Sequence, residues 1–308
     1  SLLIGQLCLW PFVFKYVSFE KPNWSIIRSH FKPNCVLMIS VIAVSIYTLM
    51  DKIMIEWMTT TTEVGYYENT EKIVAIANNA AGAVGAVMLP RVSNLRASGN
   101  DDRVLSYIGK SMKYIMLIAV ALAFGIAGVS KSFSIVYYGK EFEKCGTLLM
   151  VISPAIIFYA ASNILRNQYL LPKDMDRVFV TATVAASVLN FVLNAIFIPM
   201  YGALGAVIGT VGAQFGELTY QVLKTRKELP IKKYVFDVFP YICFGIVMLF
   251  ICKKIEVIKG VSVMSLIMQI MVGAVAFVIM VSIYFIITRD ELFEGIIDKI
   301  RKGIKSRK

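Results

Sequence analysis

Apolar stretches long enough to cross a bilayer recur along the whole chain. Eight such windows lie at about 33–57, 64–90, 107–130, 147–171, 178–199, 202–222, 234–252 and 261–288. Each offers about 20 residues, the length of α-helix that spans the hydrocarbon core. Of the 308 residues, 57% are hydrophobic, which lies outside the usual range of a soluble domain. Because backbone polar groups in lipid must be satisfied internally, the sequence predicts an all-α, polytopic membrane helical bundle.

The first residues form a stretch shorter than a full span. The chain begins at Ser1, and residues 1–14 are apolar apart from a few positions. No basic segment precedes this stretch and no small-residue cleavage site follows it, so a signal peptide is disfavoured. We interpret 1–14 as the end of a truncated transmembrane helix in a C-terminal fragment, followed by a cytoplasmic linker over 15–32.

The basic residues alternate between connections. The connections 15–32, 91–113, 172–177, 223–233 and 289–308 hold 23 Lys and Arg residues, whereas the alternate ones hold 6. This asymmetry follows the positive-inside rule and predicts that the basic connections and the C-terminus face the cytoplasm. The net charge of +12 is thus explained by topology, and no nucleic acid partner is predicted. The tail 289–308 fits an amphipathic helix on an anionic membrane surface or a solvated basic end.

The cysteines and the histidine do not form a metal motif. Five cysteines are scattered along the chain, mostly in apolar windows, and the single histidine, His30, lies in a basic connection. Such spacing indicates neither a disulfide framework nor a metal cluster. We therefore predict no metal site and no cofactor.

Five of the windows carry polar side chains on one helical face, at spacings of three and four. These stripes include Lys52, Glu71, Asn78, Asn163, Arg166, Asn190, Asn194, Thr210, Gln214 and Glu217. Hydrogen-bonding seams between helices produce similar patterns. Ionisable residues, however, cost about 2.5–3.5 kcal/mol each at mid-membrane, which favours a shared aqueous cavity. The windows 234–252 and 261–288 are nearly free of such stripes and are expected at the periphery.

Glycines form a second pattern in the window 202–222. Gly202, Gly205, Gly209, Gly212 and Gly216 share one helical face. Such a face lets a neighbouring backbone approach closely. Tight static packing and a sliding surface both fit this pattern.

Four segments resemble a known family. LNFVLNAIFIPMYGALGAVIGT (189–210) resembles the paired-asparagine helix, Pro-x-Tyr-Gly turn and Gly-Ala helix of Wzx-type flippases of polysaccharide repeat units, in the MATE-like exporter superfamily. YTLMDKIMIEW (47–57) with VGYYENTEKI (64–73), and MLPRVSNL (88–95), are similar to other helices of that family. Glu56 and Thr70 depart from the pattern, since a Gly and an Ala are expected there.

The resemblance implies the C-terminal lobe of a two-lobed transporter, without enzymatic activity, in the bacterial cytoplasmic membrane. Residues 33–222 would form its six-helix lobe, 223–288 two additional helices and 289–308 the basic cytoplasmic tail. The substrate implied is a polyprenyl-diphosphate-linked oligosaccharide for O-antigen or capsule synthesis. Membrane lipids and other polysaccharide-assembly membrane proteins would be its partners.

The stripes supply groups that suit this substrate. Lys52 and Arg166 would neutralise the diphosphate, whereas Asn78, Asn163, Asn190, Asn194 and Gln214 would bind the glycan. Asp51, Glu71 and Glu217 would couple transport to an ion or act as counter-charges, and both roles stay open. A drug or cation antiporter of the same fold would favour acidic residues in the cavity. A membrane glycan polymerase or ligase is a third alternative, but the outer connections are short and lack clustered carboxylates.

Overall fold

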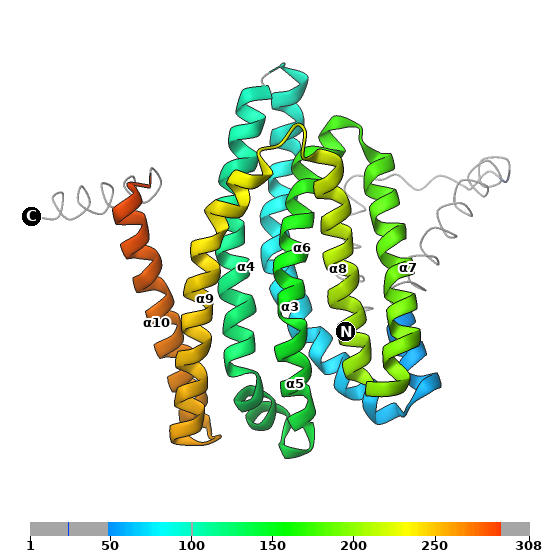
Figure 1. Cartoon of the computed structure of the whole chain (residues 1–308), viewed down its shortest axis with the longest axis vertical. Coiled ribbons are helices and arrows are strands. Elements are labelled where there is room, and N and C mark those ends of the chain that lie inside the picture. Colours follow the sequence, from blue (N-terminus) through cyan, green and yellow to red (C-terminus); the bar gives the residue numbers. More distant parts are fainter. Residues whose placement is uncertain (1–23, 25–48, 100, 291–308) are drawn as a thin grey trace, which may run out of the picture. The chain divides into compact units, whose positions relative to one another are not determined.

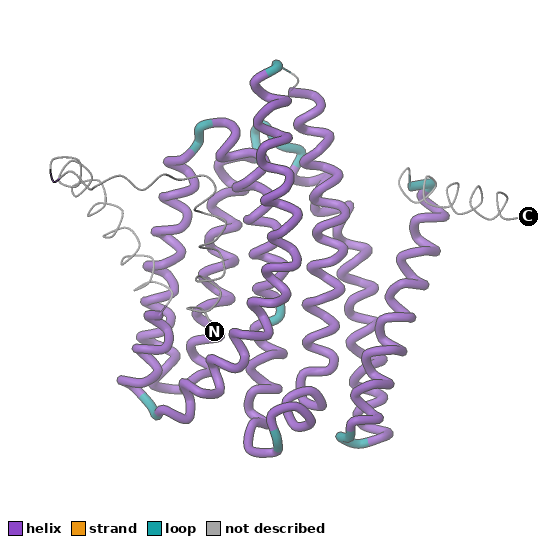
Figure 2. The backbone as a smooth tube through the Cα atoms, turned by 180° about the vertical axis from the view of Figure 1, so that it is seen from behind, coloured by secondary structure: helices purple, strands orange, loops and turns teal. Residues whose placement is uncertain are grey.

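The computed structural model describes residue 24, residues 49–99 and residues 101–290 (Figure 1). The chain divides into two compact units, Ser1–Leu49 and Met50–Lys308, and the helices named below belong to the described part of the second. The expected helix end at 1–14, the linker at 15–32, most of the first window and the tail beyond 290 lie outside the described residues. Within the described ranges every regular element is helical (Figure 2), which confirms the all-α prediction.

The helices follow one another with short connections. After a helical segment at 49–58 come α3 (Thr61–Ala97), α4 (Asp101–Tyr138), α5 (Glu143–Ile152), α6 (Pro154–Leu165), α7 (Asp176–Tyr201), α8 (Ala203–Thr225), α9 (Ile231–Lys259) and α10 (Val263–Thr288). Short turns η1 (Lys140–Phe142), η2 (Arg166–Leu170) and η3 (Leu171–Lys173) complete the order. Each predicted window from 64–90 onward coincides closely with one of these helices or, for 147–171, with the helices from α5 to η3.

Four helices, α4, α7, α9 and α10, are long and apolar enough to cross a membrane. The count is five if the bent pair around α5 and α6 forms one span. That α3 and α8 also cross stays a prediction. With 38 residues, α4 is about 57 Å long at 1.5 Å per residue, which exceeds a hydrocarbon core about 30 Å thick.

Two sequence-based expectations need correction. The basic connection 91–106 is mostly helical, because α3 continues to Ala97 and α4 begins at Asp101. The turn between them contains Gly99, whose φ of 70° suits a residue without Cβ. The window 147–171 is not one straight helix, since it bends by 43° at the break before Pro154. Proline lacks a backbone N–H and begins a new helix there.

The hairpin of α7 and α8 is packed through the glycine face. A Cβ at Gly209 would lie 2.1 Å from Asn194 Oδ1, and one at Gly205 would lie 2.2 Å from the Phe197 carbonyl oxygen. Both helices therefore approach more closely than any larger residue allows. On the other side of α7, Val180, Val184 and Val188 are exposed, as suits side chains that face lipid.

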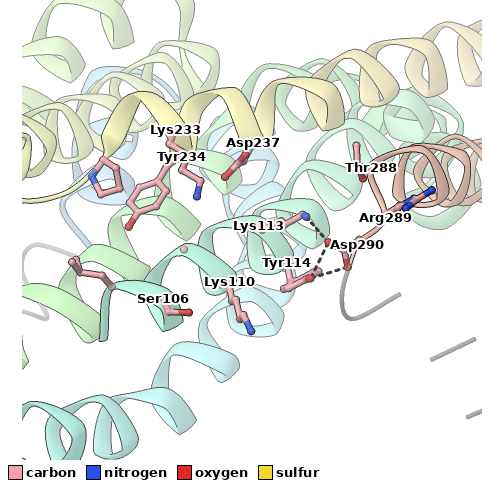
Figure 3. A pocket seen from close by; sticks show the side chains of 13 residues that line it. Ser106, Lys110, Lys113, Tyr114, Lys233, Tyr234, Asp237, Thr288, Arg289 and Asp290 are labelled. Carbon is pink, nitrogen blue, oxygen red and sulfur yellow. Dashed lines mark hydrogen bonds and ion pairs between the residues drawn. The ribbon is translucent and has the colours of Figure 1, made fainter. Parts of the chain in front are cut away.

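α9 and α10 form a layer beside α4 (Figure 1). Large apolar side chains cover the outside of α10, where Ile279, Ile283 and Ile286 are exposed. Asp290, which follows α10, ties the end of this helix to α4: its carboxylate accepts hydrogen bonds from Lys113 and from the Tyr114 hydroxyl, the latter at 2.9 Å (Figure 3).

Candidate functional site

The Asp51 carboxylate connects four helical segments. It accepts hydrogen bonds from the Tyr67 hydroxyl and from Asn194 Nδ2, each at 2.6 Å, and from Thr210 Oγ1 at 3.3 Å. Asn194 also donates to Asn190 Oδ1 at 3.2 Å. Among the described residues, no basic side chain lies within 4 Å of Asp51. The carboxylate is thus held by neutral donors from α3, α7 and α8.

Lys52, the next residue, points to a different partner. Its ammonium lies 2.9 Å from Glu71 Oε2, and the two side chains are 26% and 40% exposed. Successive residues of a helix are about 100° apart, so Asp51 and Lys52 reach different surroundings. The counter-charge of Lys52 in this conformation is therefore Glu71 on α3, and not Asp51.

Arg166 begins the π-helical turn η2 at the end of α6. π-Helical turns inside α-helices are rare and occur frequently at functional sites. The guanidinium lies 5.4 Å from the centre of the Phe179 ring. Glu217 of α8 accepts a hydrogen bond from Gln221 Nε2 at 3.2 Å. Among the described residues, no carboxylate oxygen lies within 4 Å of the Arg166 guanidinium, so the roles of Arg166 and Glu217 as cation and counter-charge stay a prediction.

The remaining predicted amides, Asn78, Asn163 and Gln214, share no hydrogen bond with one another among the described residues. Asn163 accepts a hydrogen bond from Asn167 at 3.0 Å, and its Nδ2 lies 3.9 Å from the position of a Cβ on Gly82. The oxygens Oδ1 of Asn78 and Oε1 of Gln214 are buried without a hydrogen-bond partner among the described residues. These amide oxygens therefore have unused acceptor capacity in this conformation.

Within the described part of the chain, no hydrogen bond or ion pair joins the Asp51 cluster to Arg166. The structure therefore brings only some of the predicted residues together. Asp51, Asn190 and Asn194 form one group, and Lys52 and Glu71 form a second. No group of three or more His, Cys, Asp or Glu side chains suited to a metal ion is found among the described residues.

The family model described as "Lipid II flippase MurJ" matches residues 2–288. The chain belongs to this family. A solved structure, "Lipid II flippase MurJ, inward closed conformation", aligns with a TM-score of 0.73 over 92% of this chain and 60% of that chain, at 17% sequence identity. This likeness shows that the fold is that of a helical MurJ transporter.

Three curated relatives extend the comparison. The "Probable low-salt glycan biosynthesis flippase Agl15" of Haloferax volcanii is 27% identical over 68% of this chain and 45% of its own length. A "Putative O-antigen transporter" of Shigella dysenteriae is 23% identical over 55% of this chain and 42% of its length. "Lipid II flippase MurJ" of Bacillus subtilis is 25% identical over 51% of this chain and 29% of its length. The chain thus spans less than half the length of these relatives.

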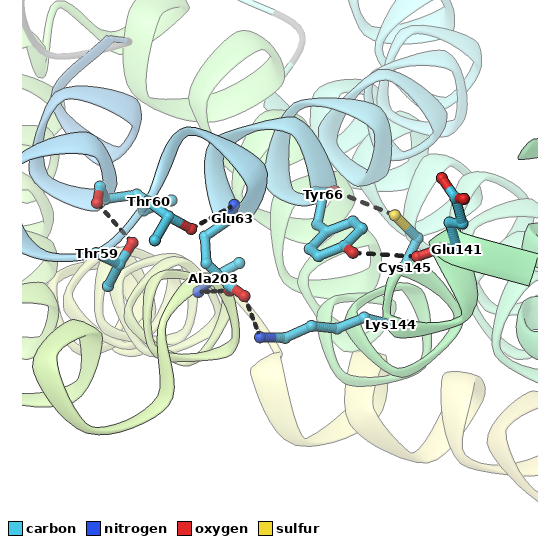
Figure 4. Close-up of polar contacts among 9 residues, drawn as sticks. Thr59, Thr60, Glu63, Tyr66, Glu141, Lys144, Cys145 and Ala203 are labelled. Atoms are coloured by element: carbon cyan, nitrogen blue, oxygen red, sulfur yellow. Dashed lines mark hydrogen bonds and ion pairs between the residues drawn. The ribbon is translucent and has the colours of Figure 1, made fainter.

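Sequence reasoning missed the polar contacts of Glu63, which connect three helices of this MurJ-family bundle. Glu63 of α3 binds Lys144 of α5 at 2.5 Å and accepts a hydrogen bond from the backbone N–H of Ala203, at the start of α8, at 2.8 Å (Figure 4). The Glu63 backbone N–H is bound by the side chain of Thr60 at 3.4 Å. The sequence Thr-x-x-Glu at 60–63 is a capping-box signal and could have identified the start of α3, but not the contacts of Glu63 with α5 and α8.

Tyr67 was also missed as a polar residue. Its side chain is 2% exposed, and its hydroxyl binds Asp51 while lying 3.2 Å from Thr210 Oγ1. An aromatic residue at helical spacing is indistinguishable in sequence from a core residue. The only signal was the position of Tyr67 four residues before Glu71 on the same helical face.

Proposed function

We propose that the transporter to which this chain belongs moves a polyprenyl-diphosphate-linked glycan from the cytoplasmic to the outer leaflet by alternating access. The observation that carries the proposal is the half-exposed ion pair of Lys52 and Glu71 in a MurJ-family membrane bundle. Charges in such a bundle normally face a water-filled cavity rather than lipid. A cation there can exchange its carboxylate partner for a phosphate of the substrate.

Arg166 provides a second cation in the proposed substrate path. A guanidinium presents several N–H donors in a fixed fork that matches phosphate oxygens. Glu217 would balance this charge while the substrate is absent, and the guanidinium lies 5.4 Å from the centre of the Phe179 ring. The diphosphate would then contact Lys52 and Arg166 in turn or together, depending on the transport state.

The glycan would be bound by the amides. Asn78 and Gln214 each carry a buried oxygen that lacks a partner among the described residues, and Asn163 Nδ2 and the Tyr159 hydroxyl each lie 3.9 Å from the Cβ position of Gly82. Hydroxyl groups of sugars are donors as well as acceptors, so they can satisfy such oxygens. The prenyl chain would stay in lipid, where it needs no polar partner.

Within this proposal, the glycan carried by the lipid is a saccharide repeat unit of the O-antigen or capsule class. It is supported by the relatives named as a glycan biosynthesis flippase and an O-antigen transporter, which align over 68% and 55% of this chain. The family model described as a lipid II flippase favours lipid II as a second candidate. The mixed pairing of cations with carboxylates argues against a drug or cation antiporter, which would favour acidic residues alone.

The organisation of this transporter is part of the proposal. The chain supplies a C-terminal, MATE-like lobe over 33–222 with two peripheral helices over 223–288 and a tail at 289–308, and the C-terminus lies in the cytoplasm of a bacterial cell. Partners are membrane lipids and other polysaccharide-assembly membrane proteins. The support is the basic-residue asymmetry of 23 against 6 and the peripheral layer of α9 and α10 beside α4.

Complementation in two hosts tests the proposal. One host lacks its repeat-unit flippase and the other is depleted of its lipid II flippase; both receive the transporter that contains residues 1–308. We expect surface polysaccharide to return in the first host and no growth recovery in the second. Recovery of growth alone would indicate that the substrate is lipid II rather than the repeat unit. Equal protein levels with neither recovery, and with no flipping of either substrate in proteoliposomes, would overturn the proposed function.

A further inference from the structure

A cationic pocket lies where the first turns of α4 and α9 meet the end of α10 (Figure 3). Its volume is about 550 Å³, and its charged lining residues are Lys110, Lys113, Lys233, Asp237, Arg289 and Asp290. Four basic and two acidic side chains give a formal charge of +2. We propose that this pocket binds the phosphate headgroup of an anionic membrane phospholipid. The proposal does not rest on the proposed transport function.

The proposal depends on the positive charges of Lys233 and Arg289. Asp290 is 5% exposed and engaged by Lys113 and Tyr114. Among the described residues, no acidic side chain lies within 4 Å of Lys233 or Arg289. Figure 3 shows Lys233 on α9 and Arg289 after α10, on two different walls of the pocket. An anion between these walls would be approached by cations from both sides.

Tyr234 supplies an observation that is independent of charge. Its side chain is 5% exposed and lines the pocket, and its hydroxyl has no hydrogen-bond partner among the described residues. The ring packs over Gly109 of α4, with Cε1 3.7 Å from the position of a Cβ there. A buried hydroxyl left unpaired is unfavourable for the folded protein. A phosphate oxygen in the pocket would accept a hydrogen bond from it.

The start of α9 adds backbone donors to the same place. This helix of 29 residues begins after Pro230, and no side chain caps its first turn. Uncapped N–H groups and the positive end of the helix dipole favour an anion at a helix N-terminus. Pro230 and Lys233 both line the pocket, so the helix start, the Lys233 ammonium and the Tyr234 hydroxyl converge on it.

A neighbouring apolar pocket indicates a lipid rather than a free anion. This second pocket, of about 190 Å³, shares Tyr234 with the first and is lined mainly by apolar side chains of α4, α6, α8 and α9, among them Met112, Met116, Leu218 and Val235. Tyr234 thus separates a cationic space from an apolar one. An amphiphile with a phosphate head and an acyl chain complements both.

The test is lipid binding by the purified chain in neutral detergent, followed by native mass spectrometry. Phosphatidylglycerol and phosphatidylcholine are added at equal concentrations. We expect preferential binding of phosphatidylglycerol and a loss of at least about tenfold in affinity for the double variant Lys233→Gln with Arg289→Gln, the factor that corresponds to about 1.4 kcal/mol. Tyr234→Phe removes only the hydroxyl and should weaken binding while the preference for the anionic lipid remains.

A matched control changes two lysines at the opposite end of α9. Lys254→Gln with Lys259→Gln removes the same charge from exposed positions and should leave binding unchanged. The proposal is overturned if this control loses as much affinity as Lys233→Gln with Arg289→Gln, or if both lipids bind equally. It is also overturned if inorganic phosphate displaces phosphatidylglycerol as readily as the lipid itself does, because the site would then serve a free anion.

Discussion

The Lys52 ammonium lies 2.9 Å from the Glu71 carboxylate, and this contact joins the helical segment 49–58 to α3. Both side chains keep part of their surface exposed, so the contact is open to exchange. An exposed ion pair contributes little to stability, about 0–1 kcal/mol. The pair therefore supplies little folding energy, and in the proposed function a substrate phosphate would replace Glu71 as the partner of Lys52.

Replacing Lys52 by Ala should stop transport without loss of the protein. The lost phosphate contact is a charge-assisted hydrogen bond, worth about 1.5–3 kcal/mol, so substrate affinity should fall at least about tenfold. Lys52→Arg keeps the charge and should restore much of the transport. The measurement is export in a flippase-deficient host at matched membrane levels.

Lys72 provides the matched control for that measurement. It pairs with Glu68 on the same helix at 3.1 Å, with side chains 61% and 45% exposed. Lys72→Ala should export normally, because this pair is a surface contact between residues four apart. Normal export by Lys52→Ala would show instead that its charge is structural.

The helical bundle was predictable from the sequence to a large extent, because helix length and polar periodicity are local properties. The shared face of Asn190 and Asn194 is confirmed, because the two side chains form a hydrogen bond. The bend before Pro154 was missed, although proline marks such a break. The windows gave helix positions but not the extensions of α3 and α4 beyond the membrane-length core.

The partners of the site residues were less accessible to sequence reasoning. Glu63 binds Lys144 and Ala203, which lie 81 and 140 positions away. Asp51 binds Asn194, 143 positions away. Helical periodicity identifies the face on which a residue lies, but the choice of partner depends on how the helices pack. The π-helical turn at Arg166 likewise depends on its surroundings rather than on a recognisable local motif.

Gly209→Ala should destabilise the bundle. The new methyl group would lie 2.1 Å from Asn194 Oδ1, so α7 and α8 would have to separate or Asn194 would have to leave Asp51. Overpacking of this kind costs about 1–3 kcal/mol, and the thermal unfolding midpoint in detergent should fall. Gly65→Ala is the control: no atom lies within 4 Å of its Cβ position in α3, so helix propensity should stabilise it by about 0.5–1 kcal/mol. Equal midpoints for both variants would contradict close packing at Gly209.

Glu63→Gln should loosen the contact between α3, α5 and α8. The amide oxygen can still accept from the Ala203 N–H, but the ion pair with Lys144 is lost. Since Lys144 is 40% exposed, solvent screening limits the expected loss to about 1 kcal/mol. Glu143→Gln, which removes the exposed pair with Lys131 at 2.8 Å, should change stability less. Thermal unfolding of both variants in the same detergent decides between them.

The orientation is testable with single cysteines. Ser98 and Thr61 are exposed at opposite ends of α3, and the basic-residue asymmetry predicts that Ser98 faces the cytoplasm. In a variant without the five native cysteines, a membrane-impermeant thiol reagent should label Ser98→Cys only after the membrane is opened. Thr61→Cys should react in intact cells. Labelling of both from outside, in cells that exclude the reagent, would contradict the predicted topology.

Arg166→Lys and Arg166→Ala should differ in a way that separates charge from geometry. Arg166 begins a π-helical turn and lies 5.4 Å from the centre of the Phe179 ring. Lysine keeps the charge but loses the planar fork that binds two phosphate oxygens, so export should fall only partly, whereas alanine should abolish it. Arg177→Ala, at an exposed position near the start of α7, is the control and should export normally. If Arg166→Ala exports as well as this control at equal membrane levels, Arg166 does not bind the substrate, and the cationic path must rest on Lys52 alone.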